Sequence, residues 1–231
     1  MRNPDEMRAE ADSSNPMPTA LVAITTAPKL AVYSWPDLLP EAVEAFHQHK
    51  SVVISVVTEI TTLRDQARLQ IRHALRDLFS QAFSIPQEQV RIVGSAGQAL
   101  SICINSSDTD KYAHEQEIAL GVSISHEPGL SIAAISFQKN IGIDLMRVDL
   151  SLDWRDVTQL YLGDEVYKKI AGQTVQHQLL MFAQEWTMQE ARLKSQGLAL
   201  SEWHPDLAAR LKKCRTILLD LPSGYVGAIA F

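Results

Sequence analysis

Side chains that could do chemistry gather in three short stretches of the second half of the chain. Ser125 and His126 stand together shortly before a Pro-Gly pair. Asp144 interrupts an apolar run, where its carboxylate loses hydration unless it is paired or bound to a metal. Glu190 and Lys194 are four residues apart, which places them on one face of a helix. Such groups can hold a cation, bind phosphate or move a proton.

Each of these features also has an ordinary structural explanation. A strand-end aspartate often accepts the N–H groups of a turn, and His126 can serve as a turn or cap residue. A surface pair between Glu190 and Lys194 contributes only about 0.3–0.5 kcal/mol. Arginines at every fourth position of the first long helix are typical of a solvated face, although the same row could hold phosphates. The row consists of Arg64, Arg68, Arg72 and Arg76.

The elements that must position these residues begin with three strands. Period-two runs over 120–125, 130–136 and 141–145 are separated by turn-forming tetrapeptides, which predicts a three-stranded meander. The first and third strands of a meander run in the same direction. We therefore expect Ser125, His126 and Asp144 to emerge at one edge of the sheet.

The rest of the chain alternates helices with strands. We predict helices over about 40–49, 63–83 and 175–195, a buried strand over 51–57, and closing strands over 215–220 and 225–231. Further strands are expected over 21–25, 30–35, 89–93 and 99–104. Thr61 and Thr62 are candidate caps of the helix at 63–83. Its apolar side is marked by Leu69, Leu75, Leu78 and Phe79.

The element order predicts two lobes. Residues 1–18 are polar and rich in Pro, Ser and Asn, which indicates a flexible tail. We expect a first lobe over 19–112 and a second lobe over 113–231, which carries the metal and catalytic motifs. Each half offers strands, a long helix and a hairpin. The predicted fold class is therefore α+β, with two pseudo-duplicated lobes, each a small antiparallel sheet packed against a long helix.

Composition narrows the class of protein. The chain has 231 residues, of which 46% are hydrophobic, enough to bury a core as one large domain or two small lobes. Its formal charge of −6 argues against general affinity for nucleic acid or an anionic membrane. No apolar stretch predicts a membrane span. Two cysteines without a C-x-x-C pair suggest a reducing cytoplasm.

The combination and order of the motifs resemble the 4'-phosphopantetheinyl transferases of the surfactin-synthetase (Sfp) type. The family's signatures are a serine–histidine pair at a strand end, a (V/I)G(V/I)D strand, and a W-x-x-K-E-A-x-x-K helix followed by a glycine. The residues in those places are Ser125-His126, Ile141-Gly142-Ile143-Asp144, and Trp186, Gln189, Glu190, Ala191, Lys194 and Gly197. The resemblance covers the chain from about residue 20 onward and is most specific in the second half.

The resemblance implies two similar α+β lobes in one chain with coenzyme A bound between them. It implies a magnesium-dependent enzyme that moves 4'-phosphopantetheine from coenzyme A to a serine of an acyl- or peptidyl-carrier protein and releases 3',5'-ADP. The expected partners are the carrier protein and coenzyme A. Because one chain supplies both halves of the cleft, a monomer is expected.

The resemblance also implies roles for the acidic and basic residues. Asp144 and Glu190 are expected to hold magnesium, which prefers carboxylates together with substrate phosphates and water. Glu190 is also expected to assist deprotonation of the incoming serine. Lys194 is expected to contact the coenzyme and to stabilise or protonate the leaving phosphate.

Phosphate contacts are expected from residues of both halves. By resemblance, Ser125 and His126 hold coenzyme A phosphates, and Arg68 or Arg72 reaches the 3'-phosphate. Two lysines common in the family are replaced in this chain, by Gln189 in the helix motif and by Gln98 in the first lobe. Since a neutral contact is weaker than a charge-assisted one, weaker binding of coenzyme A is expected.

The metal strand departs from the family pattern as well. Many members carry a second acid two residues after the aspartate, but here Met146 follows Asp144 at that spacing, and a thioether is a poor magnesium ligand. Some members with methionine there use the residue after the histidine, which is Glu127 in this chain. We therefore expect Glu127 to supply the third protein oxygen.

Two other hypotheses remain beside the transferase. A non-catalytic carrier-binding protein could have kept the fold after losing phosphate contacts. Retention of Asp144, Glu190 and Lys194 argues against it, because a binder has no need of them. An unrelated α+β domain would require every motif to be coincidental, which their order makes a weaker explanation.

Overall fold

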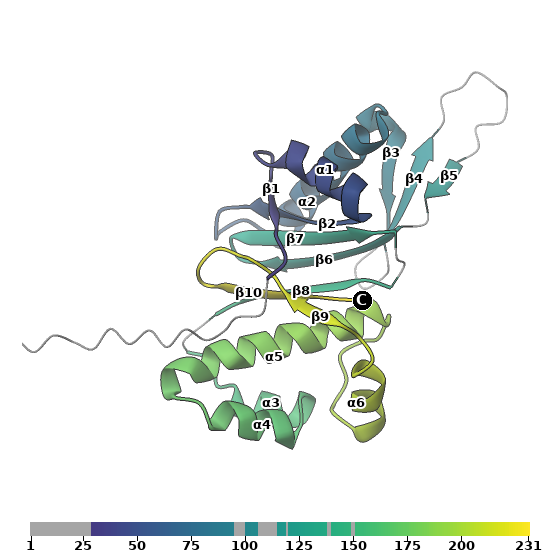
Figure 1. The fold of residues 1–231 in the computed structure, drawn as a ribbon. Helices are drawn as coiled ribbons and strands as arrows, with labels where there is room; N and C mark the ends of the chain where they lie inside the picture. Colours follow the sequence, from purple (N-terminus) through teal and green to yellow (C-terminus); the bar gives the residue numbers. More distant parts are fainter. Residues whose placement is uncertain (1–28, 95–99, 106–114, 119, 138–139, 149–150) are drawn as a thin grey trace, which may run out of the picture.

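The computed structural model describes residues 29–94, 100–105, 115–118, 120–137, 140–148 and 151–231. These residues form six α-helices and three small sheets (Figure 1). The predicted α+β class is confirmed. The predicted tail over 1–18 and the predicted strand over 21–25 lie outside the described residues.

A four-stranded sheet in the order β1-β2-β7-β6 lies at the centre of the fold. Its strands are β1 (Tyr33–Trp35), β2 (Ser51–Val57), β7 (Leu130–Ser136) and β6 (Gly121–Glu127). β1 is parallel to β2, and the other neighbours are antiparallel. The helices α1 (Leu39–His49) and α2 (Arg64–Phe83) cover one face of the sheet and bury an apolar core against it (Figure 1).

A second sheet in the order β8-β10-β9 packs on the other face of the first. Its strands are β8 (Gly142–Arg147), β10 (Tyr225–Ala230) and β9 (Thr216–Leu218), all antiparallel. The helix α5 (Val175–Ser195) covers the far side of this sheet, where Ala191 packs against Ala228 and Ala230. The layers therefore run helix, sheet, sheet, helix (Figure 1).

Smaller elements complete the described chain. The short 3-10 helix η1 (Gln87–Gln89) leads into an antiparallel sheet of β3 (Val90–Val93), β4 (Ser101–Asn105) and β5 (Glu115–Ile118). The helices α3 (Arg155–Tyr161) and α4 (Asp164–Ala171) share an aromatic core with α5, and α6 (Pro205–Leu211) packs near its end. Within the described residues, no helix combines the length and apolar character that crossing a membrane requires.

The predicted three-stranded meander is wrong in its third strand. β6 and β7 form the expected hairpin, but β7 pairs on its other edge with β2, and β8 pairs with β10. Every residue of β7 is buried, so this strand needs a neighbour on each edge and a cover on each face. The equally apolar β2 supplies the second neighbour. The central sheet thus joins strands from both sides of residue 112.

Most predicted helix and strand ranges agree with the structure. Two details predicted for α2, its cap and its apolar side, do not. The N-cap of α2 is Leu63, and no side chain caps it, so the predicted capping by Thr61 or Thr62 is wrong. Leu69 is 68% exposed, so it does not belong to the apolar side of this helix. The buried side is instead formed by Ala67, Ile71, Ala74, Leu75, Leu78, Phe79 and Ala82.

The contact between α5 and β8 depends on the absence of a side chain at Gly142. A Cβ atom there would lie 2.0 Å from the Ala191 carbonyl oxygen and 2.4 Å from the Ser195 nitrogen. Both are backbone atoms of α5, which cannot move aside as a flexible side chain does. Gly142 therefore sets the distance at which α5 lies on β8.

We predict that Gly142→Ala lowers the free energy of unfolding by about 3 kcal/mol, the upper part of the usual range for overpacking. Urea denaturation followed by circular dichroism measures the effect. Gly172→Ala is the matched control, because Gly172 has φ −73° and its nearest contact would lie at 3.3 Å. Equal stability of the two variants would contradict this account of the contact.

Candidate functional site

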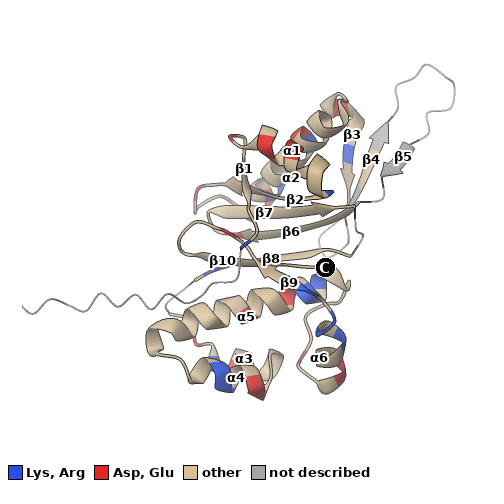
Figure 2. Cartoon of the chain, in the orientation of Figure 1, with Lys and Arg blue, Asp and Glu red and all other residues tan. Residues whose placement is uncertain are grey.

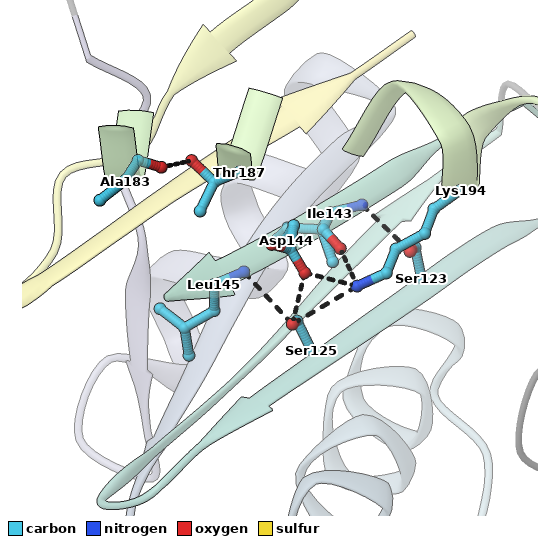
Figure 3. A network of polar contacts seen from close by, with 8 residues as sticks. All are labelled: Ser123, Ser125, Ile143, Asp144, Leu145, Ala183, Thr187 and Lys194. Carbon is cyan, nitrogen blue, oxygen red and sulfur yellow. Dashed lines mark hydrogen bonds and ion pairs between the residues drawn. The ribbon is translucent and has the colours of Figure 1, made fainter. Parts of the chain in front are cut away.

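The site lies where the edges of the two main sheets meet. β6 and β8 belong to different sheets but lie side by side. The Ile143 N–H donates to Ser123 Oγ at 3.0 Å, and the Leu145 N–H donates to Ser125 Oγ at 3.2 Å. The residue numbers of both partners increase together from one bond to the next, so β6 and β8 run parallel. We call this contact the seam, and serine hydroxyls take the place of a backbone ladder along it (Figure 3).

Asp144 stands at the centre of the seam and is bonded from two other elements (Figure 3). Its Oδ1 accepts hydrogen bonds from Ser125 Oγ at 3.0 Å and from the Lys194 ammonium at 2.6 Å. Lys194 also donates to the Ile143 carbonyl oxygen at 3.1 Å and lies 3.5 Å from Ser125 Oγ. The predicted proximity of Ser125 and Asp144 is therefore confirmed, although their strands, β6 and β8, belong to two different sheets.

Three carboxylates, those of Glu127, Asp144 and Glu190, line the cleft around this centre. Burial raises the pKa of Asp144, and the charge and hydrogen bonds of Lys194 oppose that shift. Burial and the Asp144 charge raise the pKa of Glu190 above its ordinary value. The same two causes raise the pKa of Glu127, which the Arg147 backbone N–H partly offsets. The acids predicted as metal ligands thus interact electrostatically at one place.

His126 lies next to the carboxylates but is surrounded by cationic groups. Its Nδ1 is 2.8 Å from Ser131 Oγ, which leaves Nε2 as the ring nitrogen for a ligand. Burial, followed by the charges of Arg64, Arg68 and Lys194, lowers the pKa of His126 to about 4. The imidazole is therefore neutral at pH 7, and it can contact a phosphate by a hydrogen bond but not by an ion pair.

A cleft of about 1690 Å³ runs between α2, the seam and α5. Among the described residues its charged lining consists of five basic residues, Arg64, Arg68, Arg72, Lys194 and Arg210, and four acidic ones, Asp65, Glu127, Asp144 and Glu190. This described lining is therefore slightly positive, whereas the net charge of the chain is −6. Figure 2 shows acidic and basic positions together at the C-terminal end of α5.

Three of the four arginines in the predicted row line the cleft. Arg64, Arg68 and Arg72 line it, whereas Arg76 does not. Arg68 forms an exposed ion pair with Asp65 at 3.0 Å, and Arg72 donates to the Gly94 carbonyl oxygen at 2.8 Å. The α2 wall therefore offers guanidinium groups at the spacing of one helical turn.

Gln189 and Ser125 were both predicted to contact the coenzyme, but they differ in their position relative to the cleft. Gln189, predicted to contact the coenzyme, is not among the described residues that line the cleft, and Gln98 lies outside the described residues. Ser125 lines the cleft, but its hydroxyl is bonded to Asp144 and Leu145. Its observed bonds are therefore structural.

Two residues of the site were missed at the level of sequence. Ser123 bonds to Ile143 across the seam, and Arg210 of α6 lines the cleft. The period-two spacing of Ser123 and Ser125 places both hydroxyls on one face of β6, and this could have indicated a polar contact. No pattern near Arg210 distinguishes it from any surface arginine.

Glu127, Asp144 and Glu190 are the candidate magnesium ligands of the cleft. In the part of the chain that the structure describes, no group of three or more His, Cys, Asp or Glu side chains is gathered closely enough to hold a metal ion. Lys194 instead holds Asp144. The donor chemistry nevertheless fits, because Glu127, Asp144 and Glu190 present only oxygen donors, and the Asp144 charge raises the pKa of each glutamate. A divalent cation is the ligand that such a group of acids suits.

Neither a scan against protein-family models nor a search of curated proteins found a match for this chain.

We predict that Ser125→Ala lowers the free energy of unfolding by about 1–3 kcal/mol, because the buried Leu145 N–H and Asp144 Oδ1 both lose a partner. Ser123→Ala removes one bond, from Ile143, and should have the smaller effect. Urea denaturation measures both. Ser201→Ala, at an exposed position, is the control and should change stability by less than about 0.5 kcal/mol. If Ser125→Ala behaves like the control, the hydroxyl does not hold the seam.

Proposed function

We propose that this protein transfers 4'-phosphopantetheine from coenzyme A to a serine of an acyl- or peptidyl-carrier protein and releases 3',5'-ADP. One observation carries the proposal: Glu127, Asp144, Glu190 and Lys194, which come from three separate elements, line the same cleft as the arginines of α2. Acids that suit a divalent cation and cations that suit phosphates thus share one space. The ordered motifs described above supply the reaction class.

The size of the cleft supports a long, charged co-substrate. Pockets for drug-sized ligands measure about 300–1,000 Å³, whereas this cleft measures about 1690 Å³. Its basic wall on α2 suits the nucleotide phosphates of coenzyme A, and its acidic centre at the seam suits a cation that would neutralise the charge of the pyrophosphate. The proposed function includes two lobes, over 19–112 and 113–231. In this division β6 and β7 belong to the second lobe by sequence but pair with the sheet of the first lobe.

Magnesium would be held by Asp144, Glu190 and Glu127. When bound, it supplies positive charge that neutralises the pyrophosphate oxygens and positions them. The rest of the chemistry falls to side chains of the chain itself. His126 would donate a neutral hydrogen bond to a phosphate, and Arg68 or Arg72 would pair with the 3'-phosphate.

The transfer is a displacement at phosphorus. The serine oxygen of the carrier protein forms a bond to the phosphorus that bears pantetheine, and the bond from that phosphorus to the bridging oxygen breaks. The serine proton passes to Glu190, directly or through a water molecule. The bridging oxygen leaves with 3',5'-ADP, and the Lys194 ammonium stabilises its negative charge or protonates it.

An apo carrier protein incubated with coenzyme A, magnesium and the full chain should gain the mass of phosphopantetheine. We predict that Glu190→Gln lowers the initial rate by at least about 100-fold, because general-base assistance is lost. Mass spectrometry of the carrier protein measures the rate. Glu165→Gln is the matched control, because Glu165 is an exposed carboxylate of α4 that does not line the cleft.

The outcomes of this assay separate the hypotheses. A normal rate for Glu190→Gln would remove the proposed base. Absence of the mass increment on every carrier tested, together with a stable complex between the protein and a carrier, would favour the non-catalytic carrier-binding protein. Absence of both transfer and carrier binding would favour the third hypothesis, an unrelated α+β domain in which the motifs are coincidental.

We also predict that Glu127→Ala raises the magnesium concentration for half-maximal rate by at least about ten-fold, because loss of even outer metal partners costs about 10–100-fold in affinity. A magnesium titration of the transfer rate measures it. Asp65→Ala, which removes an exposed acid of the same cleft, is the control and should leave that concentration unchanged. Equal magnesium dependence of Glu127→Ala and the parent would show that Glu127 is not a ligand.

A further inference from the structure

The position of a cation next to Asp144 is already taken by a side chain of the protein. The ammonium of Lys194 lies 2.6 Å from Asp144 Oδ1, and its other acceptors are the Ile143 carbonyl oxygen at 3.1 Å and Ser125 Oγ at 3.5 Å. An ammonium group has three N–H donors. All three therefore have an acceptor at the seam (Figure 3).

Lys194 is the more exposed partner of this ion pair. The side chain of Lys194 is 31% exposed, whereas that of Asp144 is 9% exposed, and both residues line the cleft. The Oδ1 atom of Asp144 also accepts from Ser125. A carboxylate oxygen accepts about two hydrogen bonds, so Oδ1 has no further acceptor position. A cation that ligates this oxygen must displace one of its two donors, and repulsion between like charges selects the Lys194 ammonium instead of the neutral Ser125 hydroxyl.

The Lys194 ammonium is bonded to one of the three candidate magnesium ligands of the cleft, and the charges of Arg64 and Arg147 act on Glu127. Glu127, Asp144 and Glu190 together can carry three negative charges, and Asp144 repels both glutamates. The Glu190 carboxylate has no hydrogen-bond donor within the described part of the chain. A divalent cation at Asp144 carries twice the charge of the Lys194 ammonium, which is bonded to this one acid. The electrostatics therefore favour exchange once such a cation is present.

We propose that the Lys194 ammonium and a divalent cation are alternative partners of the Asp144 Oδ1 atom, so that cation binding at this oxygen displaces Lys194 from the seam into the cleft. The inference rests on the cation site of the proposed function. A lysine has a compact charge on a flexible four-carbon chain, which allows this movement without a change in α5. The displaced ammonium then becomes available to an anionic ligand in the cleft. Cation binding and anion binding are thereby coupled through one side chain.

The first experiment measures the affinity of the full chain for Mn²⁺ by electron paramagnetic resonance, with no coenzyme or carrier present. Mn²⁺ prefers oxygen ligands as Mg²⁺ does. Lys194→Met should bind Mn²⁺ at least about ten-fold more tightly than the parent, because methionine removes the ammonium that competes for Asp144 Oδ1. Lys194→Arg, which keeps the charge, should bind no more tightly than the parent.

A control is required because any lost positive charge favours a cation. Arg210→Met removes a cation from the same cleft, and no contact joins Arg210 to Asp144 within the described residues. Its Mn²⁺ affinity should stay within about two-fold of the parent, as expected for a screened charge. If Arg210→Met tightens binding as much as Lys194→Met does, general electrostatics explain the effect and the proposal is overturned.

The remaining outcomes separate this inference from the function on which it rests. Equal Mn²⁺ affinity of the parent and Lys194→Met overturns the displacement of Lys194 while the cation site stands. Absence of Mn²⁺ binding in the parent and in both Lys194 variants overturns the cation site itself, and with it both proposals.

A second experiment needs no variant and so does not depend on how well Lys194→Met folds. Acetylation of the parent by a small activated ester, followed by peptide mass spectrometry, reports how accessible each lysine is. Addition of Mg²⁺ should accelerate acetylation of Lys194 several-fold and leave that of Lys168, an exposed residue of α4, unchanged. An unchanged rate at Lys194, with Mn²⁺ binding established, would contradict the displacement.

Discussion

The carboxylate of Asp144 is the group on which the rest of the site depends. It lies on an otherwise apolar strand and is buried, so its charge is costly unless other groups bond to it. Ser125 and Lys194 provide those bonds. They come from β6 and α5, which belong to opposite layers of the fold. A single buried acid therefore requires the central sheet, the second sheet and the long helix to meet at one place.

The way in which the two sheets meet explains why a cleft forms there. Between β6 and β8 the backbone N–H groups of Ile143 and Leu145 bond to serine hydroxyls instead of to carbonyl oxygens. Side chains at this contact are therefore polar, whereas the strands on either side are packed in apolar cores. Ser125 and Asp144 are largely buried but border the cleft that α2 and α5 enclose.

Local pattern predicted much of the fold because local interactions decide it. The helix over 175–195 and the strand over 51–57 agree with α5 and β2, since their apolar spacing and β-branched runs leave few alternatives. Pairing between strands was less predictable. β8 follows β7 in the chain yet pairs with β10, because β7 is buried on both faces and takes β2 as its second neighbour. Leu69 shows the same limit, since apolar character alone did not reveal that it faces the cleft.

The sequence by itself determined which residue types are available for chemistry and in what order they occur. A carboxylate in an apolar strand, a glutamate and lysine one turn apart, and a serine–histidine pair are visible without any structure. Only the tertiary structure decided that Lys194 bonds to Asp144 instead of to Glu190, its neighbour on the helix. The physical reason is that residues 50 positions apart become neighbours through packing, and burial at the seam makes that ion pair stronger than one on a solvated helix face.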